Sequence, residues 1–140
     1  MQSSAKKILI TGVSGFLGSN CAKAFLDSGY IVRGTVRSVN NPAKIDPLRE
    51  AFGPAFERLE LVEADLMNEE SLARAAEGVD FICHTASPIP ASQPKDENEL
   101  VTPAVNGTLG IMRAAHRNGV KRMVMTSSCA SIEKYPRDRK

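Results

Sequence analysis

The chain has 140 residues, of which 42% are hydrophobic and 24% charged, and it carries a net charge of only +2. This length and composition suit one soluble globular domain, whereas the low charge argues against a nucleic-acid partner and the short apolar runs against a membrane span. Residues 1–7 lack the apolar stretch of a signal peptide. Cys21, Cys83 and Cys129 are dispersed and only two histidines are present, so we expect buried free thiols, no metal site and a reducing, cytoplasmic location.

The first predicted elements are a strand over residues 6–11, a turn that contains Gly12, Gly15 and Gly18, and a helix over residues 15–28. A helix N-terminus offers unpaired N–H groups and the positive end of the helix dipole to an anion. Glycine lets the backbone turn sharply and approach a pyrophosphate without a Cβ between them. The G-x-x-G-x-x-G spacing, one residue longer in its first gap than the G-x-G-x-x-G fingerprint, therefore predicts a dinucleotide-binding loop.

The rest of the chain alternates strands and helices. Apolar spacing predicts that Leu17, Cys21 and Ala24 form the buried face of the first helix, which ends at Gly29. Further strands are predicted at residues 31–36, 59–63, 79–85 and 122–126, and helices at residues 43–52 and 97–118. A short helix that ends near Gly78 is predicted between them, capped by Ser71 or by the Asn68-Glu69-Glu70 run before it. We expect the helix at 43–52 to be interrupted or kinked near Pro47. The last helix carries one apolar stripe, formed by Val101, Val105, Leu109 and Met112.

Strands joined by helices call for a parallel sheet with helices on both faces. Right-handed crossovers then predict an α/β, doubly wound (Rossmann) fold with strand order 3-2-1-4-5 and with ligands at the carboxyl ends of strands one and four. We expect this domain to span residues 1–132. Residues 133–140 hold six charges and are expected to form a solvated tail.

The end of the second strand bears on which dinucleotide binds. A ribose 2′-hydroxyl pairs with an acidic residue there, whereas a 2′-phosphate pairs with arginine. No Asp or Glu occurs between residues 30 and 45, but three basic residues do: Arg33, Arg37 and Lys44. Arg37 is best placed just after the strand, and Lys44 adds charge from the next helix, while mid-strand Arg33 is expected to point to solvent. The pattern predicts NADP(H); the alternative is that these are ordinary surface residues.

Six short motifs, in chain order, carry a resemblance to a known family. They are Thr11-Gly12-x-x-Gly15-Phe16-Leu17-Gly18, Gly34-Thr35-Val36-Arg37, Ala64-Asp65-Leu66, His84-Thr85-Ala86-Ser87-Pro88, Asn106-Gly107-Thr108 and Thr126-Ser127-Ser128. Together they cover nearly the whole chain, which thus resembles the extended short-chain dehydrogenase/reductases, and most closely the dihydroflavonol reductase and cinnamoyl-CoA reductase group. This resemblance implies an NADPH-dependent reductase that transfers hydride to a ketone, aldehyde or thioester carbonyl of a small molecule.

The resemblance also implies cofactor contacts after the first and third strands. Those of the glycine loop are Gly12, Ser14, Gly15, Phe16, Leu17 and Gly18. Asp65 and Leu66 stand where the family meets the adenine, with the acid accepting from the exocyclic amine. The structural alternative for Asp65 is an acid at a helix N-terminus, where it interacts with the helix dipole.

The end of the fourth strand is expected to line the path of the cofactor. Its small residues Thr85, Ala86 and Ser87 let the cofactor pass close to the backbone, although small side chains also suit any tight strand end. His84, directly before them, is interpreted as a strand-end histidine without catalytic duty.

Family members use a serine, a tyrosine and a lysine. The tyrosine donates a proton to the carbonyl oxygen as hydride arrives, the lysine lowers the pKa of the tyrosine and holds the ribose, and the serine hydrogen-bonds the carbonyl. Ser128 matches that serine, and its neighbour Ser127 is expected to face the nicotinamide; the alternative for both is a polar strand end. The Tyr-x-x-x-Lys pair is missing, because Tyr135 is followed by Pro136 and has Arg139 four residues on.

Two interpretations remain open for a chain that lacks the later strands and the substrate lobe. In the first, the 140 residues are the N-terminal cofactor half of a longer reductase and are inactive alone; in the second, they are a complete, non-catalytic nucleotide-binding module. A sugar-nucleotide epimerase relative fits the glycine loop too, but such enzymes use NAD, against which Arg37 argues. The loop at 88–94 alone could touch a substrate. Apolar surface that later elements would cover predicts self-association.

Overall fold

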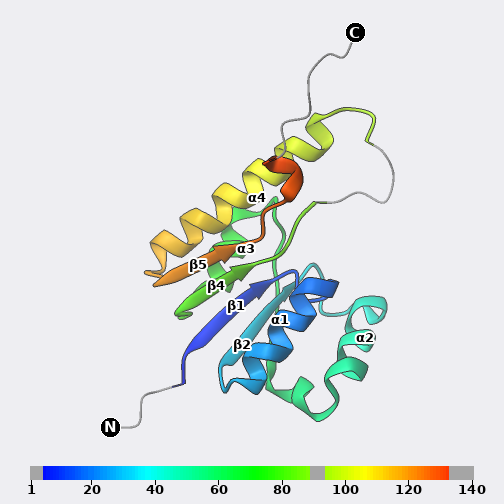
Figure 1. Ribbon diagram of the computed structural model, residues 1–140, viewed down its shortest axis with the longest axis vertical. Helices are drawn as coiled ribbons and strands as arrows, with labels where there is room; N and C mark the ends of the chain where they lie inside the picture. Colours follow the sequence, from blue (N-terminus) through cyan, green and yellow to red (C-terminus); the bar gives the residue numbers. More distant parts are fainter. Residues whose placement is uncertain (1–4, 89–93, 133–140) are drawn as a thin grey trace.

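The computed structural model describes residues 5–88 and 94–132, and its centre is a sheet of five parallel strands (Figure 1). The strands are β1 (Lys7–Thr11), β2 (Ile31–Val36), β3 (Leu59–Glu63), β4 (Phe81–His84) and β5 (Arg122–Met125), in the order β3-β2-β1-β4-β5. This arrangement confirms the predicted doubly wound fold. The predicted tail at 133–140, with Tyr135, and most of the loop at 88–94 lie outside the described residues.

Helices cover both faces of the sheet. They are α1 (Phe16–Asp27), α2 (Pro42–Phe52), α3 (Glu69–Ala75) and α4 (Asn98–Arg117), with the 3-10 turns η1 (Gly53–Arg58) and η2 (Cys129–Ser131). One core lies between the sheet and α1 and α2, and includes Ile8 and Ile10; the other lies between the sheet and α3 and α4, and includes Leu9. β1 is therefore buried on both faces, which explains its unbroken apolar run.

The buried face of α1 differs from the prediction. Its buried residues are Gly18, Ala22 and Leu26, whereas Leu17 and Ala24 are exposed and Cys21 is half-buried. The apolar pattern selected the wrong stripe because a glycine gives no hydrophobic signal, although Gly18 is the residue that lets α1 approach the sheet.

The end of α1 agrees with the prediction that Gly29 stops the helix. Gly29 has a φ of +82°, the left-handed conformation that glycine adopts without strain. The N–H of Tyr30 donates to the carbonyl of Phe25, and the N–H of Gly29 donates to that of Leu26. These two bonds form a Schellman motif, and the rings of Phe25 and Tyr30 pack edge to face beside it.

Helix α4 packs through small residues rather than through its large apolar ones. Its buried residues are Gly107, Gly110, Ile111 and Ala114. A Cβ on Gly107 would lie 2.9 Å from the side chain of Leu66, and one on Gly110 would lie 3.0 Å from that of Leu72. The predicted apolar stripe of this helix is exposed instead, at 41% to 49% for Val101, Val105, Leu109 and Met112.

Three further expectations change. Helix α2 continues through Pro47 without interruption, and β4 is shorter than predicted. Cys129 is exposed, so only Cys21 and Cys83 are even partly buried.

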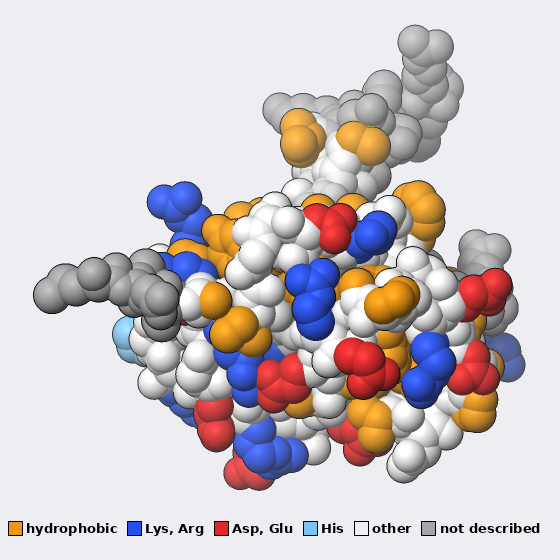
Figure 2. Space-filling model, turned by 90° about the horizontal axis from the view of Figure 1, so that it is seen from below, with side chains coloured by type: hydrophobic (Ala, Val, Ile, Leu, Met, Phe, Trp, Pro, Cys, Tyr) orange, Lys and Arg blue, Asp and Glu red, His pale blue; other side chains and the backbone are white. Residues whose placement is uncertain are grey.

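The surface agrees with the low net charge. Figure 2 shows acidic and basic side chains interspersed over one face of the molecule, and ion pairs such as Lys7 with Glu60 and Lys121 with Asp80 join opposite charges. Within residues 5–88 and 94–132, no helix has the length and apolar character needed to cross a lipid bilayer.

Candidate functional site

A pocket of about 680 Å³ opens at the carboxyl ends of β1 to β4, where this fold class holds its ligands. The glycine loop, the ends of these strands, and parts of α2 and α4 line it. Most residues predicted to bind a cofactor are among the lining residues: Gly12, Ser14, Gly15, Arg37, Lys44, Asp65, Leu66, Thr85, Ala86 and Ser87. The fold thus brings together residues from five separate stretches of the sequence.

The glycine loop is fixed by hydrogen bonds to β2. The N–H of Gly12 donates to the Thr35 hydroxyl at 3.0 Å, and the N–H of Val13 donates to the Thr35 carbonyl at 3.1 Å. Gly12 itself has a φ of +68°, which an L side chain rarely adopts, and its carbonyl accepts from the N–H of Gly15. Hydrogen bonds within the chain therefore define the loop as a tight turn.

The start of α1 is close to the loop and has no side-chain cap. A Cβ on Gly18 would lie 2.4 Å from the Gly12 carbonyl oxygen, so only glycine allows the helix to begin this close to the turn. The N-cap residue is Gly15, which offers no side-chain acceptor, and the first turn holds no acidic residue. The first N–H groups of α1 lack intrahelical partners, and together with the helix dipole they favour an anion here.

A second set of hydrogen bonds joins the end of β1 to the end of β4. The Thr11 hydroxyl accepts from the N–H groups of Thr85 and Ala86, both at 3.1 Å, and the Thr85 hydroxyl donates to the Thr11 carbonyl at 2.6 Å. The Thr11 hydroxyl also lies 2.7 Å from Nδ1 of His84, which is only 4% exposed. Burial lowers the pKa of His84, so the ring is neutral at pH 7.

Arg37 and Lys44 place two positive charges on the α2 side of the pocket. Both side chains are exposed, and within the described part of the chain neither forms an ion pair. Glu63, at the end of β3, instead accepts a hydrogen bond from the N–H of Val39 at 3.0 Å and so holds the loop that follows Arg37. The two cations are available to an anionic ligand.

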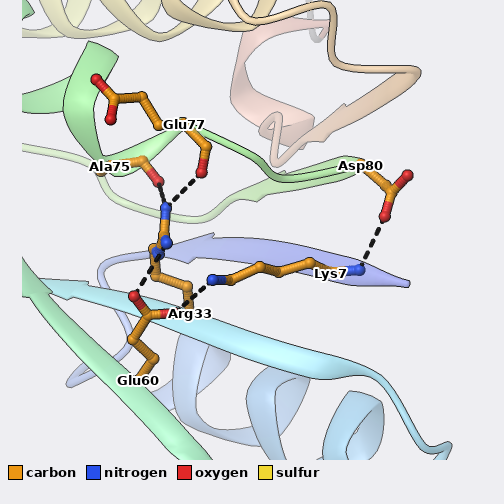
Figure 3. A network of polar contacts seen from close by, with 6 residues as sticks. All are labelled: Lys7, Arg33, Glu60, Ala75, Glu77 and Asp80. Atoms are coloured by element: carbon orange, nitrogen blue, oxygen red, sulfur yellow. Dashed lines mark hydrogen bonds and ion pairs between the residues drawn. The ribbon is translucent and has the colours of Figure 1, made fainter. Parts of the chain in front are cut away.

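Arg33 has a different environment from the one predicted. Rather than pointing to solvent, its guanidinium lies among β2, β3 and the end of α3 (Figure 3). It donates to the carbonyls of Ala75 and Glu77 at 2.8 and 2.7 Å and pairs with Glu60 at 2.9 Å. Arg33 therefore has a structural role and does not line the pocket.

Asp65 and Leu66 form the wall that follows β3. One carboxylate oxygen of Asp65 accepts from the N–H of Met67 at 2.7 Å, and its main chain bonds to the Ser71 hydroxyl. The N-cap of α3 is Asn68, whose side chain accepts from Ser71, so Asp65 does not cap this helix. The structure thus gives no support to the alternative role of Asp65 as a helix N-terminal acid.

Several predicted site residues lie outside the pocket lining. Phe16 is 89% exposed and Leu17 is half exposed, both in the first turn of α1, while Gly18 is buried against the loop. Ser127 and Ser128 are exposed and follow β5, where the Ser131 hydroxyl donates to the Ser128 carbonyl at 2.6 Å. Across the described ranges, no cluster of three His, Cys, Asp or Glu side chains could hold a metal ion.

Two threonines that fix the pocket were not predicted as site residues. Thr11 and Thr35 are buried, line the pocket, and hold the glycine loop and the end of β4 by side-chain hydrogen bonds. Two features of the sequence could have indicated them. Thr11 carries a hydroxyl directly before the glycine turn, and Thr35 carries one near the end of the neighbouring strand. Glu99 of α4 also lines the pocket, and nothing in the sequence pattern indicated it.

The chain matches the NAD dependent epimerase/dehydratase family over residues 8–140. It is 42% identical to cinnamoyl-CoA reductase 1 of Petunia hybrida over 133 residues (95% of this chain and 38% of that protein). It is 44% identical to dihydroflavonol 4-reductase of Hordeum vulgare over 133 residues (93% and 37%). These relatives confirm the resemblance that the six motifs carried.

A solved structure shares the fold. The yeast methylglyoxal/isovaleraldehyde reductase Gre2, crystallised with NADPH, superimposes with a TM-score of 0.74 at 28% identity, covering 89% of this chain and 37% of that one. The chain therefore spans less than two fifths of the length of each of these three proteins.

Proposed function

Because the chain belongs to the NAD dependent epimerase/dehydratase family, we propose that it is the NADP(H)-binding part of an oxidoreductase that reduces the carbonyl group of a small molecule. One observation carries this proposal: the start of α1, which has no side-chain cap, and two cations without ion pairs among the described residues, Arg37 and Lys44, face one pocket at the carboxyl ends of the parallel strands. A dinucleotide with an additional phosphate has anionic groups for both places.

The described residues fit NADP(H) group by group. The tight turn at Gly12 and the start of α1 suit the pyrophosphate, because backbone N–H groups and the dipole converge there. The Arg37 guanidinium, assisted by Lys44, suits the 2′-phosphate, for which it can supply two parallel hydrogen bonds. Asp65 and Leu66 suit the adenine, through an acceptor for its amine and an apolar contact.

Bound NADPH would supply the hydride for the carbonyl carbon. For this chain we assign Ser128, with Ser127 beside it, to the segment that meets the substrate carbonyl next to the nicotinamide end of the cofactor. The hydroxyl of Ser128 would donate a hydrogen bond to the carbonyl oxygen and so stabilise the negative charge that develops there.

No tyrosine in the 140 residues has a lysine four positions later, so the groups expected to donate the proton and to hold the ribose are not in this sequence. We therefore propose that residues 1–132 are an incomplete dinucleotide-binding domain followed by a charged tail, and that they bind NADPH without reducing carbonyls. The alternative is that these residues form a nucleotide-binding module without chemistry. Carbonyl-dependent NADPH oxidation by a longer chain containing residues 1–140 would favour the reductase; binding without oxidation would favour the module.

The cofactor assignment is tested with the Arg37→Ala variant. We expect the wild-type chain to bind NADPH more tightly than NADH, and the variant to lose most of this preference, about 10- to 100-fold, because a charged hydrogen bond contributes about 1.5–3 kcal/mol. Isothermal titration calorimetry with both cofactors measures the ratio. Arg74→Ala is the matched control, since Arg74 is exposed on α3 outside the pocket. Equal wild-type affinities for NADPH and NADH would contradict the assignment.

A further inference from the structure

The sequence suggested no task for His84, yet it is the most buried titratable side chain beside the pocket. It ends β4, is 4% exposed, and pairs in register with Thr11 of β1. Thr85, Ala86 and Ser87, which follow it directly, all line the pocket. The contact between His84 and Thr11 therefore also sets the position of these three residues, one wall of the pocket, relative to the glycine loop.

The hydrogen bonds of Thr11 determine which nitrogen of His84 carries the proton. A threonine hydroxyl has one donor and two acceptor positions. The N–H groups of Thr85 and Ala86 occupy both acceptor positions, so the hydroxyl proton is left for Nδ1 of His84, 2.7 Å away. Nδ1 must then be an acceptor, and the neutral ring carries its hydrogen on Nε2.

We propose that His84 is a positioning residue for the cofactor pocket: its unprotonated Nδ1 accepts the Thr11 proton and so orients the Thr11 hydroxyl to hold the Thr85 and Ala86 N–H groups against the glycine loop. This inference rests on the proposed function only in that the pocket binds NADP(H). Ala86 lies directly against the glycine loop, because a Cβ on Gly12 would lie only 3.0 Å from the Ala86 Cα. A small displacement of Ala86 would therefore change the fit between this wall and the turn.

Protonation of His84 would reverse this arrangement, because both ring nitrogens of an imidazolium are donors and neither can accept from Thr11. Burial alone lowers the pKa of His84, which favours the neutral ring. No charged side chain contributes to that shift, neither Lys7 of β1 nor Arg122 of β5, the strands that pair with β4. The same holds for the charged or titratable residues of α3 and α4: Glu69, Glu70, Arg74, Glu99, Arg113, His116 and Arg117. Acid is therefore expected to weaken cofactor binding as the pH falls through this lowered pKa, which lies below the ordinary histidine value of 6.5.

The tautomer can be measured without cofactor. Long-range ¹H–¹⁵N NMR of the imidazole rings at pH 7 should show an unprotonated Nδ1 and a protonated Nε2 for His84. His116 is the only other histidine in the chain, so a His116→Gln variant assigns the signals. A protonated Nδ1 in His84 would overturn the proposal. Because this experiment needs only the wild-type fold and an exposed substitution, it stands even if the proposed function fails.

The positioning role is tested by replacing His84 with Leu and with Asn. Asn places an amide oxygen near the position of Nδ1 and cannot be protonated, whereas Leu offers no acceptor. We expect the affinity for NADPH at pH 7.5 to fall about 10-fold in His84→Leu, the loss that follows from one buried hydrogen bond, and to be largely restored in His84→Asn. A folded His84→Leu variant that binds NADPH as tightly as the wild type would refute the role.

The pH profile separates positioning from a merely structural effect. Between pH 7.5 and 5, the affinity of the wild type for NADPH should fall more steeply than that of His84→Asn. Titration of the 2′-phosphate, with a pKa of about 6, affects both proteins equally and cancels in their ratio. Parallel profiles would refute the proposal. If the wild type binds no NADPH at any pH, the proposed function fails, while the tautomer measurement still decides the hydrogen bond.

Discussion

The Cα of Gly18 faces the main chain of the turn that precedes α1. A Cβ at this position would meet the Gly12 carbonyl oxygen at 2.4 Å and the Thr85 hydroxyl at 3.0 Å. Neither neighbour is the flexible end of a long side chain, so the helix would have to move away from the turn. The three glycines of the motif are thus not equivalent, since Gly15 is exposed and its Cβ would lie 3.3 Å from the same carbonyl oxygen.

Gly18→Ala should therefore lower both stability and cofactor affinity. We expect the free energy of unfolding to fall by about 1–3 kcal/mol, the usual cost of overpacking, and NADPH binding to weaken because the start of α1 moves. Urea unfolding and calorimetry measure the two effects. Gly119→Ala is the control: Gly119 has a φ of +63° but open space around it, so its replacement should cost about 1 kcal/mol and leave binding unchanged. Unchanged binding in a folded Gly18→Ala variant would contradict the prediction.

Arg33 and Arg37 are the same residue type four positions apart, yet Arg33 stabilises the fold and Arg37 lines the pocket. Arg37 ends in the pocket, whereas Arg33 ties β2 to β3 through Glu60 and to the end of α3 through two carbonyls (Figure 3). A cation at a helix C-terminus also interacts favourably with the helix dipole. Lys7 of β1 pairs with Glu60 too, so one carboxylate links the charges of three neighbouring strands.

Arg33→Ala should destabilise the protein without changing its preference between cofactors. We expect the free energy of unfolding to fall by about 2 kcal/mol, because the variant leaves the carbonyls of Ala75 and Glu77 without their donor. Arg37→Ala should show the opposite result, with unchanged stability and lost NADPH preference. Denaturation curves and cofactor titrations on both variants test the pair. A change of cofactor preference in folded Arg33→Ala would contradict the structural role.

The Glu60 network also predicts part of the acid sensitivity. Burial raises the pKa of Glu60, but hydrogen bonds from Arg33 and Lys7 outweigh it, so the pKa lies below its ordinary value of 4.5. The folded state thus holds this proton more weakly than the unfolded chain, and the contribution to stability is full above pH 4.5 and is lost as pH falls through the lowered pKa. Glu60→Gln should show a shallower loss of stability between pH 5 and 3 in denaturation experiments. An identical slope would contradict the prediction.

At the scale of elements, the sequence predicted what depends on local pattern. Strand order, the stop at Gly29 and the place of the pocket follow from apolar runs, turn residues and the rules of parallel sheets. The buried faces of α1 and α4 were wrong because both helices pack through glycines, such as Gly18 and Gly107, which carry no hydrophobic signal. Close packing of a helix depends on its tertiary neighbours. The large apolar residues on another stripe of each helix led the sequence pattern to predict the wrong buried face.

In the candidate site too, some features could be predicted from the sequence and others could not. Positions after each strand were predictable because the carboxyl ends of parallel strands meet at one edge. The roles of Thr11, Thr35 and Arg33 were not, because each depends on a partner that the fold brings from elsewhere in the chain, His84 in the case of Thr11. A local sequence pattern does not show which distant residues the fold brings into contact.

At the scale of the whole molecule, the exposed apolar stripe of α4 remains without a described partner. Its four residues, Val101, Val105, Leu109 and Met112, stand on the outer side of the helix, and Val124 of β5 is 60% exposed. Apolar surface of this kind favours association in water. We propose that copies of the 140-residue chain associate through this stripe.

The association should depend on concentration and on the stripe itself. We expect sedimentation velocity to give a mass above that of the monomer at high concentration, and Val105→Glu to shift the protein towards monomer, because the added charge would have to be buried in the contact. Ala104→Glu adds the same charge on the exposed side of α4 outside the stripe and serves as the control. A wild-type chain that stays monomeric throughout, or equal effects of both variants, would exclude this contact.

The position of β1 between β2 and β4 has a consequence for the order in which the molecule is assembled during synthesis. The glycine loop is synthesised before β4, because the two residues that bond to the Thr11 hydroxyl, His84 and Ala86, follow 73 and 75 residues later. A nascent chain that ends before β4 thus contains the complete glycine motif and the residue Thr35 that bonds to it on one side, but not the wall on the other side. The pocket becomes whole only when β4 pairs with β1, so the glycine motif is made well before the wall that completes its pocket.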